Sequence, residues 1–161
     1  MNRLAVRPLS ADDRSWLTAF MAERWGGVAA AGGRLHRLDE LPGFAAWDGD
    51  RVAGVVTYLV EGERCEVVSL DAVTEGAGVG TALIEAACEA ARARGCGRVE
   101  LVTTNDSLRA LRFYQRRGFE LTELRPGAVD RARATLKPSI PPVGEDGIPI
   151  RDELVLTRSL S

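Results

Sequence analysis

The sequence predicts an α/β fold, in which helices pack on the faces of a mixed sheet. One observation is a strand, glycine loop and helix in direct succession, over 65–70, 75–81 and 79 to about 94. A second is the order of the remaining patterns, which reads β-α-β-β-β-α-β-α-β-loop-β. A chain that alternates apolar strands and amphipathic helices in this way buries both by packing helices on a sheet.

The N-terminal quarter predicts a short strand and a helix. The strand covers 4–6 and ends at Pro8. Ser10 is a typical N-cap, and an apolar stripe follows it until the glycine pair at 26–27 ends the helix. The next stretch, 28–41, is rich in glycine and alanine and shows no clear periodicity, so no element is assigned to it.

A hairpin is expected next. Apolar runs at 44–47 and 51–60 flank Asp48-Gly49-Asp50, a sequence typical of a tight turn. A second turn at 61–63 then leads into the strand that precedes the glycine loop.

The C-terminal half contains four more patterns and one long loop. The patterns are a strand at 99–104, an amphipathic helix at 108–116, a strand at 118–124 and a closing strand at 153–157. The segment 126–149 is rich in proline and glycine, with a helical turn expected around 129–136. Loops longer than ~12–15 residues are often functional, so this loop is a candidate wall of a binding site.

Composition restricts the class of protein. A chain of 161 residues is most simply one domain, 1–161. Its net charge of −2 gives no basic surface for nucleic acid or an anionic membrane, and its apolar runs are far shorter than a membrane span. The three cysteines form no C-x-x-C pair, and no apolar leader opens the chain, so a reducing cytoplasmic location and no metal site are expected.

The glycine loop predicts an anion site. Glycines let the backbone turn its N–H groups in one direction, and a following helix adds partial positive charge. A dinucleotide fingerprint would need glycine at position 81, and a phosphate-binding Walker loop would need lysine there, but the residue is Thr81. The loop residues are Gly76, Ala77, Gly78, Val79, Gly80 and Thr81.

Two motifs together resemble the GCN5-related N-acetyltransferase (GNAT) family. The loop resembles the family's Q/R-x-x-G-x-G/A motif. A later run resembles N-x-x-A-x-x-F-Y-x-x-x-G-F and is matched at Ala110, Phe113, Tyr114, Gly118 and Phe119. The resemblance covers roughly residues 51–124. It implies a mostly antiparallel sheet with a splayed central strand pair, and acetyl-coenzyme A (acetyl-CoA) as cosubstrate.

The resemblance also implies which residues bind the coenzyme. The backbone of Val68, Ser69 and Leu70 would bind the pantetheine arm, and the loop 76–81 would bind the pyrophosphate. Two positions depart from the family pattern. Glu75 stands where a glutamine or arginine is usual, and Ser107 replaces the asparagine of the second motif. Either Ser107 or Asn105 is then expected to make the polar contact near the pantetheine or acetyl end.

Catalysis by such a protein needs a proton donor and a base. Tyr114 is the expected donor, because a phenol with a pKa near ~10 stays protonated and can supply a proton to the departing thiolate. Glu66 and Asp71, on or just after the strand before the loop, are the candidate bases. His36, the one histidine, is a further candidate base or substrate contact, although its surroundings read equally well as an exposed loop.

The sequence therefore predicts an acetyl-CoA-dependent N-acetyltransferase that acts by direct attack of an amine on the thioester. The acceptor would be a small-molecule or peptide amine, and the family allows a homodimer. The alternative is a CoA-binding module with a sensory or interaction role and little catalysis.

Overall fold

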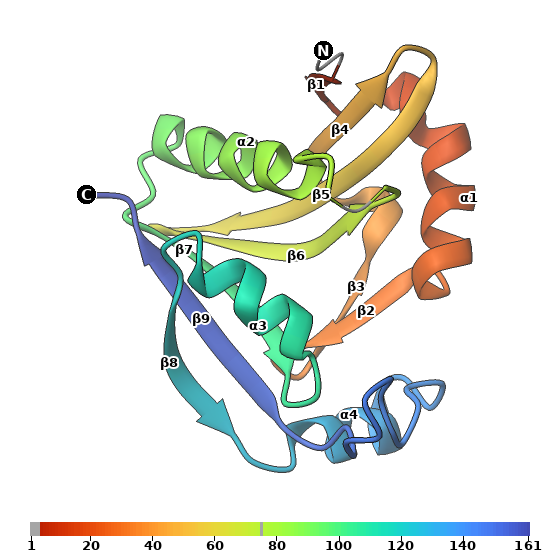
Figure 1. Cartoon of the computed structure of the whole chain (residues 1–161), viewed down its shortest axis with the longest axis vertical. Coiled ribbons are helices and arrows are strands. Elements are labelled where there is room, and N and C mark those ends of the chain that lie inside the picture. The colour runs from red at the N-terminus through yellow and green to blue at the C-terminus, as the bar shows by residue number, and fades with distance from the viewer. Residues whose placement is uncertain (1–3, 75) are drawn as a thin grey trace.

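The computed structural model describes residues 4–74 and 76–161, so Glu75 and its expected place in the loop lie outside the described residues. In this part of the chain a seven-stranded sheet has the order β1-β4-β5-β6-β7-β9-β8, and a separate two-stranded hairpin is formed by β2 and β3 (Figure 1). Only the β6–β7 pair is parallel, and every other neighbouring pair is antiparallel. The predicted mixed, mostly antiparallel sheet is confirmed.

The strands of the large sheet are β1 (Leu4–Pro8), β4 (Gly43–Asp48), β5 (Arg51–Glu61), β6 (Arg64–Ala72), β7 (Arg98–Thr104), β8 (Glu120–Arg125) and β9 (Glu153–Ser159). The small hairpin consists of β2 (Val28–Ala31) and β3 (Arg34–Arg37). The helices are α1 (Arg14–Trp25), α2 (Val79–Ala93), α3 (Leu108–Gln115) and α4 (Ala128–Thr135), with 3-10 turns at Ala11–Asp13 and Leu38–Glu40.

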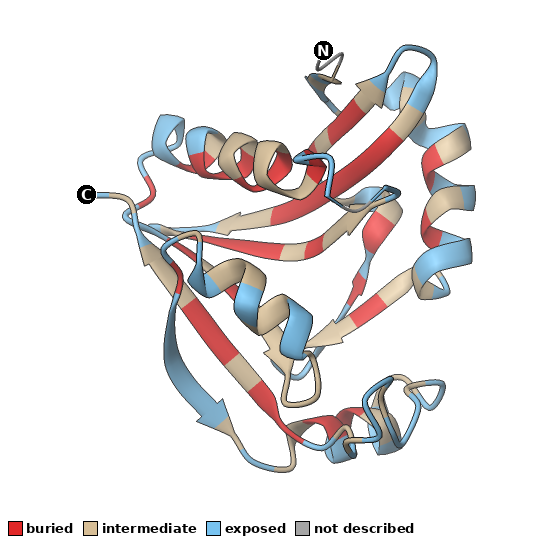
Figure 2. Cartoon of the chain, viewed as in Figure 1, coloured by how far each residue is buried: buried red, intermediate tan, exposed pale blue. Residues whose placement is uncertain are grey.

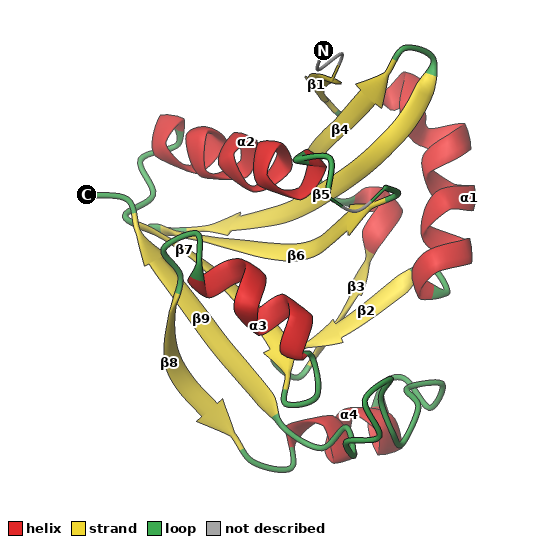
Figure 3. Cartoon of the chain, viewed as in Figure 1, coloured by secondary structure: helices red, strands yellow, loops and turns green. Residues whose placement is uncertain are grey.

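Helices cover both faces of the sheet (Figure 3). Neighbouring residues of a strand point to opposite faces. Accordingly Ala46 and Val56 belong to the buried cluster that contains α2, whereas Ala45 and Val55 belong to the cluster that contains α1. The central strands are consequently the most continuously buried part of the chain (Figure 2).

The stretch 28–41, for which the sequence predicts no element, forms the β2–β3 hairpin and a 3-10 turn. Its turn is made by Gly32 and Gly33, with φ of 61° and 76°, a backbone region that favours glycine. Of the two interpretations of His36, the exposed loop is wrong. His36 is buried on β3, and its Nε2 has no hydrogen-bond partner among residues 4–74 and 76–161.

The long loop contains the helix expected in it, since α4 covers most of 129–136. The segment after α4 is held to the helix by the side chain of Arg133. Arg133 donates hydrogen bonds to the carbonyls of Ile140, Pro141 and Ile150, each within 2.9 Å.

The predicted splay between two central strands is visible in the strand register. Parallel pairing joins Arg64–Val67 of β6 to Arg98–Leu101 of β7 and then stops, although both strands continue. On its other side β6 carries a bulge, because Thr57 pairs with Ser69 and Tyr58 with Val67, which leaves Val68 between them. Beyond this point the β7-facing edge of β6 has no strand partner among the described residues.

Candidate active site

The N-terminus of α2 forms an open backbone surface. Gly76 and Gly78 both have a φ of 77°, and a side chain at either position would meet no atom within 4 Å. The first N–H groups of a helix have no partner within it, and they carry partial positive charge. This geometry suits the anion site that the glycine loop predicts.

Arg117 brings a cation to the same place, and the sequence reasoning missed it. Its Nε donates to Thr81 Oγ1 at 2.9 Å and its Nη1 to the Phe113 carbonyl at 2.8 Å. The guanidinium also lies over the Phe113 ring, 3.7 Å from its centroid. Nothing in the local sequence distinguishes Arg117 from a basic residue that offsets the dipole at the end of α3, because its contact with α2 exists only in the folded chain.

The free edge of β6 runs from Val68 toward Leu70. The Ser69 hydroxyl is buried against Thr57 Oγ1 of β5, at 2.6 Å. The Ser69 side chain is thus occupied within the sheet, and only its backbone remains available at the splay. This arrangement agrees with a coenzyme arm bound by backbone atoms.

The two candidates for the polar contact after β7 have different surroundings. The Asn105 side chain accepts bonds from the N–H groups of Arg151 and Asp152 and donates to the Pro149 carbonyl, all within 3.0 Å. Its amide therefore holds the 149–152 segment. Ser107 begins α3, and its hydroxyl lies 2.9 Å from Thr104 Oγ1 at the end of β7. Both side chains thus have partners within the described part of the protein, but the Ser107 hydroxyl has one such contact and the Asn105 amide has three.

Tyr114 projects from α3 between two phenylalanines. Its ring makes edge-on contacts with Phe113 and Phe119, with centroids 5.1 and 5.6 Å apart. Burial raises the pKa of the Tyr114 phenol, and the negative charge of Asp71 raises it further. The phenol consequently stays protonated at neutral pH, as a proton donor must.

Asp71 lies on β6 at the splay. Its Oδ2 accepts a hydrogen bond of 2.7 Å from the indole Nε1 of Trp25, the last residue of α1. Burial raises the pKa of the Asp71 carboxyl above 3.8, although the Trp25 bond and the charge of Arg24 lower it. The sequence places Trp25 at a helix end but gives no sign of this contact across 46 residues.

Glu66 lies on a different part of the same strand. It is buried and forms an ion pair of 3.2 Å with Arg64, which also contacts Glu100 on β7 at 3.3 Å. These residues line a cavity of about 180 Å³ beneath the hairpin turn at Gly32. The fold therefore brings Asp71, rather than Glu66, into electrostatic contact with Tyr114.

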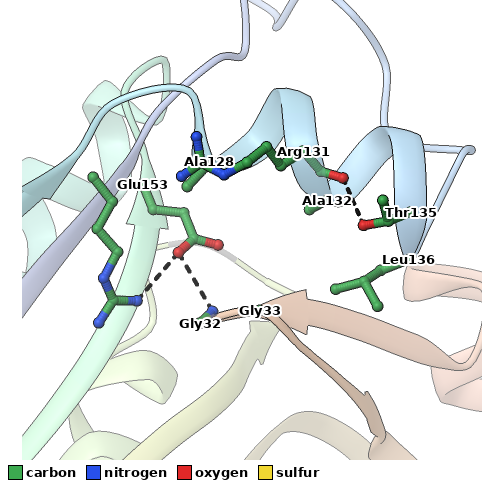
Figure 4. Close-up of a pocket in the computed structure, with 9 residues that line it drawn as sticks. Gly32, Gly33, Ala128, Arg131, Ala132, Thr135, Leu136 and Glu153 are labelled. Carbon is green, nitrogen blue, oxygen red and sulfur yellow. Dashed lines mark hydrogen bonds and ion pairs between the residues drawn. The ribbon is translucent and has the colours of Figure 1, made fainter.

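A second cavity of about 290 Å³ lies between the hairpin turn and α4 (Figure 4). It shares Gly32 and Arg125 with the smaller cavity, so the two adjoin. Glu153 forms part of its wall and accepts bonds from Arg125 Nη1 at 3.2 Å and from the Gly32 N–H at 3.3 Å. Because the wall joins three distant segments, sequence spacing could not identify it.

Within residues 4–74 and 76–161, no group of three or more histidine, cysteine, aspartate or glutamate side chains is arranged to hold a metal ion. The three cysteines are free and buried, and burial raises the pKa of the Cys65 thiol to about 12. No helix of the described chain is long and apolar enough to span a membrane.

The splayed sheet and the anion loop beside it define an enzyme class that uses an acyl-coenzyme donor, and comparison with known proteins identifies the family. Residues 6–119 match the family model described as "Acetyltransferase (GNAT) family", and the chain belongs to this family. Membership implies acetyl-CoA-dependent acetyl transfer.

The chain also resembles a relative in sequence and solved structures in fold. The chain is 44% identical over 145 residues to the uncharacterized protein YdhI of Bacillus subtilis (strain 168), covering 88% of this chain and 89% of YdhI. Its fold is similar to that of a GNAT family acetyltransferase from Elizabethkingia anophelis with acetyl-CoA bound, with a TM-score of 0.73, 16% identity and 99% of each chain covered. It is also similar to a Bacillus subtilis acetyltransferase in complex with CoA, with a TM-score of 0.69, 22% identity and 99% coverage of each chain.

Proposed function

We propose that this chain transfers the acetyl group of acetyl-CoA to a primary amine by direct attack of the amine nitrogen on the thioester carbon. The observation that carries the proposal is the electrostatic effect of the Asp71 carboxylate, on β6 at the splay, on the buried phenol of Tyr114, on α3. A proton donor and a carboxylate base at one point are what this reaction requires.

The donor would lie along the free edge of β6. Backbone groups of Val68 and Leu70 hold its pantetheine arm, and the α2 N-terminus with Arg117 holds its pyrophosphate. Ser107 supplies a polar contact on the β7 side of the splay. In this position the thioester faces the space between Tyr114 and Asp71.

Proton transfers at the nitrogen and at the sulfur balance the reaction. A primary amine has a pKa near ~10.4, and its ammonium form must first lose one proton to solvent so that its nitrogen lone pair can attack. Asp71 takes the second nitrogen proton, directly or through water, as the carbon–nitrogen bond forms. When the carbon–sulfur bond breaks, the departing thiolate receives the proton of the Tyr114 phenol, giving CoA and the acetylated amine, and the proton on Asp71 returns to the Tyr114 phenolate through water.

Asp71 is a better base than Glu66 for two reasons. Its raised pKa makes it a stronger proton acceptor than an ordinary carboxylate, and Trp25 occupies only one of its oxygens. Glu66 is held by the guanidinium of Arg64 in the smaller cavity. We therefore assign Glu66 to the acceptor side of the site, where it shapes the wall.

The direct test measures free thiol while the protein is incubated with acetyl-CoA and a panel of primary amines. Amine-dependent thiol release, together with an acetylated amine detected by mass spectrometry, supports the proposal. Tight CoA binding without thiol release on any amine would instead support the CoA-binding module expected as the alternative.

A further inference from the structure

The larger cavity contains an incompletely satisfied carboxylate. The Glu153 side chain is only 4% exposed. Among the described residues its hydrogen bonds come from Arg125 and from the Gly32 N–H, and both reach the same oxygen, Oε1. In Figure 4 the other oxygen points along the cavity beneath α4. This oxygen is open to the cavity, where water or a ligand can donate a hydrogen bond to it.

The cations near Glu153 do not contact its second oxygen among the described residues. Arg125 is divided between two acids, with ion pairs of 2.8 Å to Glu123 and 3.2 Å to Glu153. Arg131 is exposed and turns back to donate to the Pro126 carbonyl at 3.2 Å. It makes no ion pair with Glu153 among the described contacts. The buried end of the cavity therefore presents a negative group, and its open end presents Arg131.

The rest of the wall is mostly apolar, with Thr135 as its one further polar side chain among the residues that line it. Ala128, Ala132 and Leu136 of the α4 region face the hairpin glycines across the cavity (Figure 4). A wall of this kind suits a short hydrocarbon chain, since it offers apolar contact and few competing polar groups. The cavity also adjoins the smaller one, which β6 and β7 line.

We infer that this cavity selects acceptors carrying a second cationic group, which Glu153 binds through its free oxygen. This inference rests on the proposed function, because it specifies which amines the site accepts. The substrate class is an aliphatic diamine or a larger molecule with the same pair of amines. One amine is acetylated at the splay while the other is held by Glu153, and the hydrocarbon between them lies along α4.

The test compares amines that differ only at the far end. Cadaverine, pentylamine and δ-aminovalerate share a carbon chain but end in an ammonium, a methyl group and a carboxylate, and putrescine, butylamine and γ-aminobutyrate repeat the series with a shorter chain. We expect kcat/KM for the better diamine to exceed that of its matched monoamine by about tenfold or more, as for a charged hydrogen bond. Calorimetric binding of the same amines to the CoA-loaded protein gives a readout that needs no turnover.

Two variants locate the effect. Glu153→Gln keeps an oxygen for Arg125 and Gly32 but removes the charge, and it should erase the preference for diamines. Glu123→Gln removes the other carboxylate that contacts Arg125, on the exposed side, and should leave the preference intact.

Equal use and equal binding of diamines and monoamines by the wild type would overturn the inference, while thiol release would still support the proposed function. A preference for the amino acids would also overturn it and point to Arg131 as the selecting residue. Diamine binding that depends on Glu153 but is followed by no thiol release would support the inference and overturn the proposed function. Absence of both diamine binding and turnover would overturn the inference.

Discussion

At the scale of single residues, the site depends on two side chains, Tyr114 and Asp71, whose surroundings raise both of their pKa values. Burial raises the pKa of both the Tyr114 phenol and the Asp71 carboxyl, and the charge of Asp71 adds to the effect on Tyr114. The same burial has opposite chemical uses. It keeps the phenol protonated as a donor, and it makes the carboxylate a stronger base.

Replacing Tyr114 with phenylalanine should lower kcat by about 100-fold, at the lower end of the usual effect of a general acid, because the thiolate then departs without a proton. The KM for acetyl-CoA should change little, since the ring contacts remain. Steady-state kinetics measure both. Tyr58→Phe is the matched control, because Tyr58 is the other tyrosine and lies buried on β5. An unchanged kcat in Tyr114→Phe would remove Tyr114 from the mechanism.

Asp71→Asn should lower kcat/KM by about 100-fold or more while preserving the acceptor for the Trp25 indole. Its effect on stability should depend on pH. Because the folded pKa of Asp71 lies above 3.8, the neutral form contributes stability that is fully present below this value and is lost as pH rises through the folded pKa. The asparagine side chain at position 71 of the variant is neutral at every pH.

Relative to the wild type, Asp71→Asn should therefore gain stability on going from acid to neutral pH. Urea unfolding at both pH values measures this difference. A variant that loses stability at neutral pH would show that ionised Asp71 stabilises the fold, contrary to the pKa shift that burial causes.

At the scale of elements, Lys137 fastens the segment after α4 to the end of α1. Its ammonium donates to the carbonyls of Trp25 and Val28, both at 2.8 Å. Carbonyls at a helix C-terminus carry partial negative charge, so a cation is well placed there. Trp25 takes part in both contacts, because its carbonyl accepts from Lys137 and its indole donates to Asp71.

Lys137→Met should lower the free energy of unfolding by about 1–3 kcal/mol, because it leaves two part-buried carbonyls without their charged donor. Amide exchange should also become faster within 126–149. Lys137→Arg is the control, since it keeps the charge. Equal protection in the methionine variant and the wild type would mean that the loop is held by other contacts alone.

Gly54 sets the distance between β5 and α2. A side-chain carbon at this position would lie 2.4 Å from the Asp71 carbonyl and 2.7 Å from a Val79 methyl. Gly54→Ala should therefore destabilise the fold by about 1–3 kcal/mol or more through overpacking. Gly97→Ala is the control, because Gly97 has open space around it and does not have a positive φ. Denaturant unfolding compares the two.

Local patterns predict the elements that local chemistry determines. The 44–60 hairpin, the glycine loop with α2, and the last strand follow from turn residues and periodicity that lie within a few positions of one another. The β2–β3 hairpin is different, since its alanine-rich strands show too little polar and apolar alternation to be recognised. Its identity depends on packing Ala29 and Leu38 against α1, which is a tertiary effect.

The site is less predictable than the fold for the same reason. Tyr114 and the loop 76–81 carry family motifs, so resemblance finds them. Arg117 and Trp25 reach the site through contacts made in space with distant residues, and no motif marks them. Asn105 is the opposite case. It lies next to a family motif, but its side chain binds the backbone N–H groups of Arg151 and Asp152.

At the scale of the whole molecule, the proposed donor touches both the splayed strands and the two helices on one face. CoA at 100 times its Kd should stabilise the protein by about 2.7 kcal/mol, a rise in Tm of roughly 5–10 °C for a chain of this size. Arg117→Gln should reduce this rise in Tm. Arg116→Gln, which changes the exposed neighbour of Arg117, should leave it unchanged. Thermal unfolding with and without CoA tests the pair, and equal shifts in all three proteins would exclude Arg117 from the site.

The β6–β7 pairing ends at Val67 and Leu101, so a four-strand part and a three-strand part of the sheet are joined along one short paired stretch. A donor bound in the opening would supply hydrogen bonds that a continuous strand pair would otherwise make. During part of each turnover the bound substrate would thus stabilise the sheet in the place of a neighbouring strand. Release of CoA would remove these hydrogen bonds, so we expect the protein to be most rigid while it holds the molecule that it consumes.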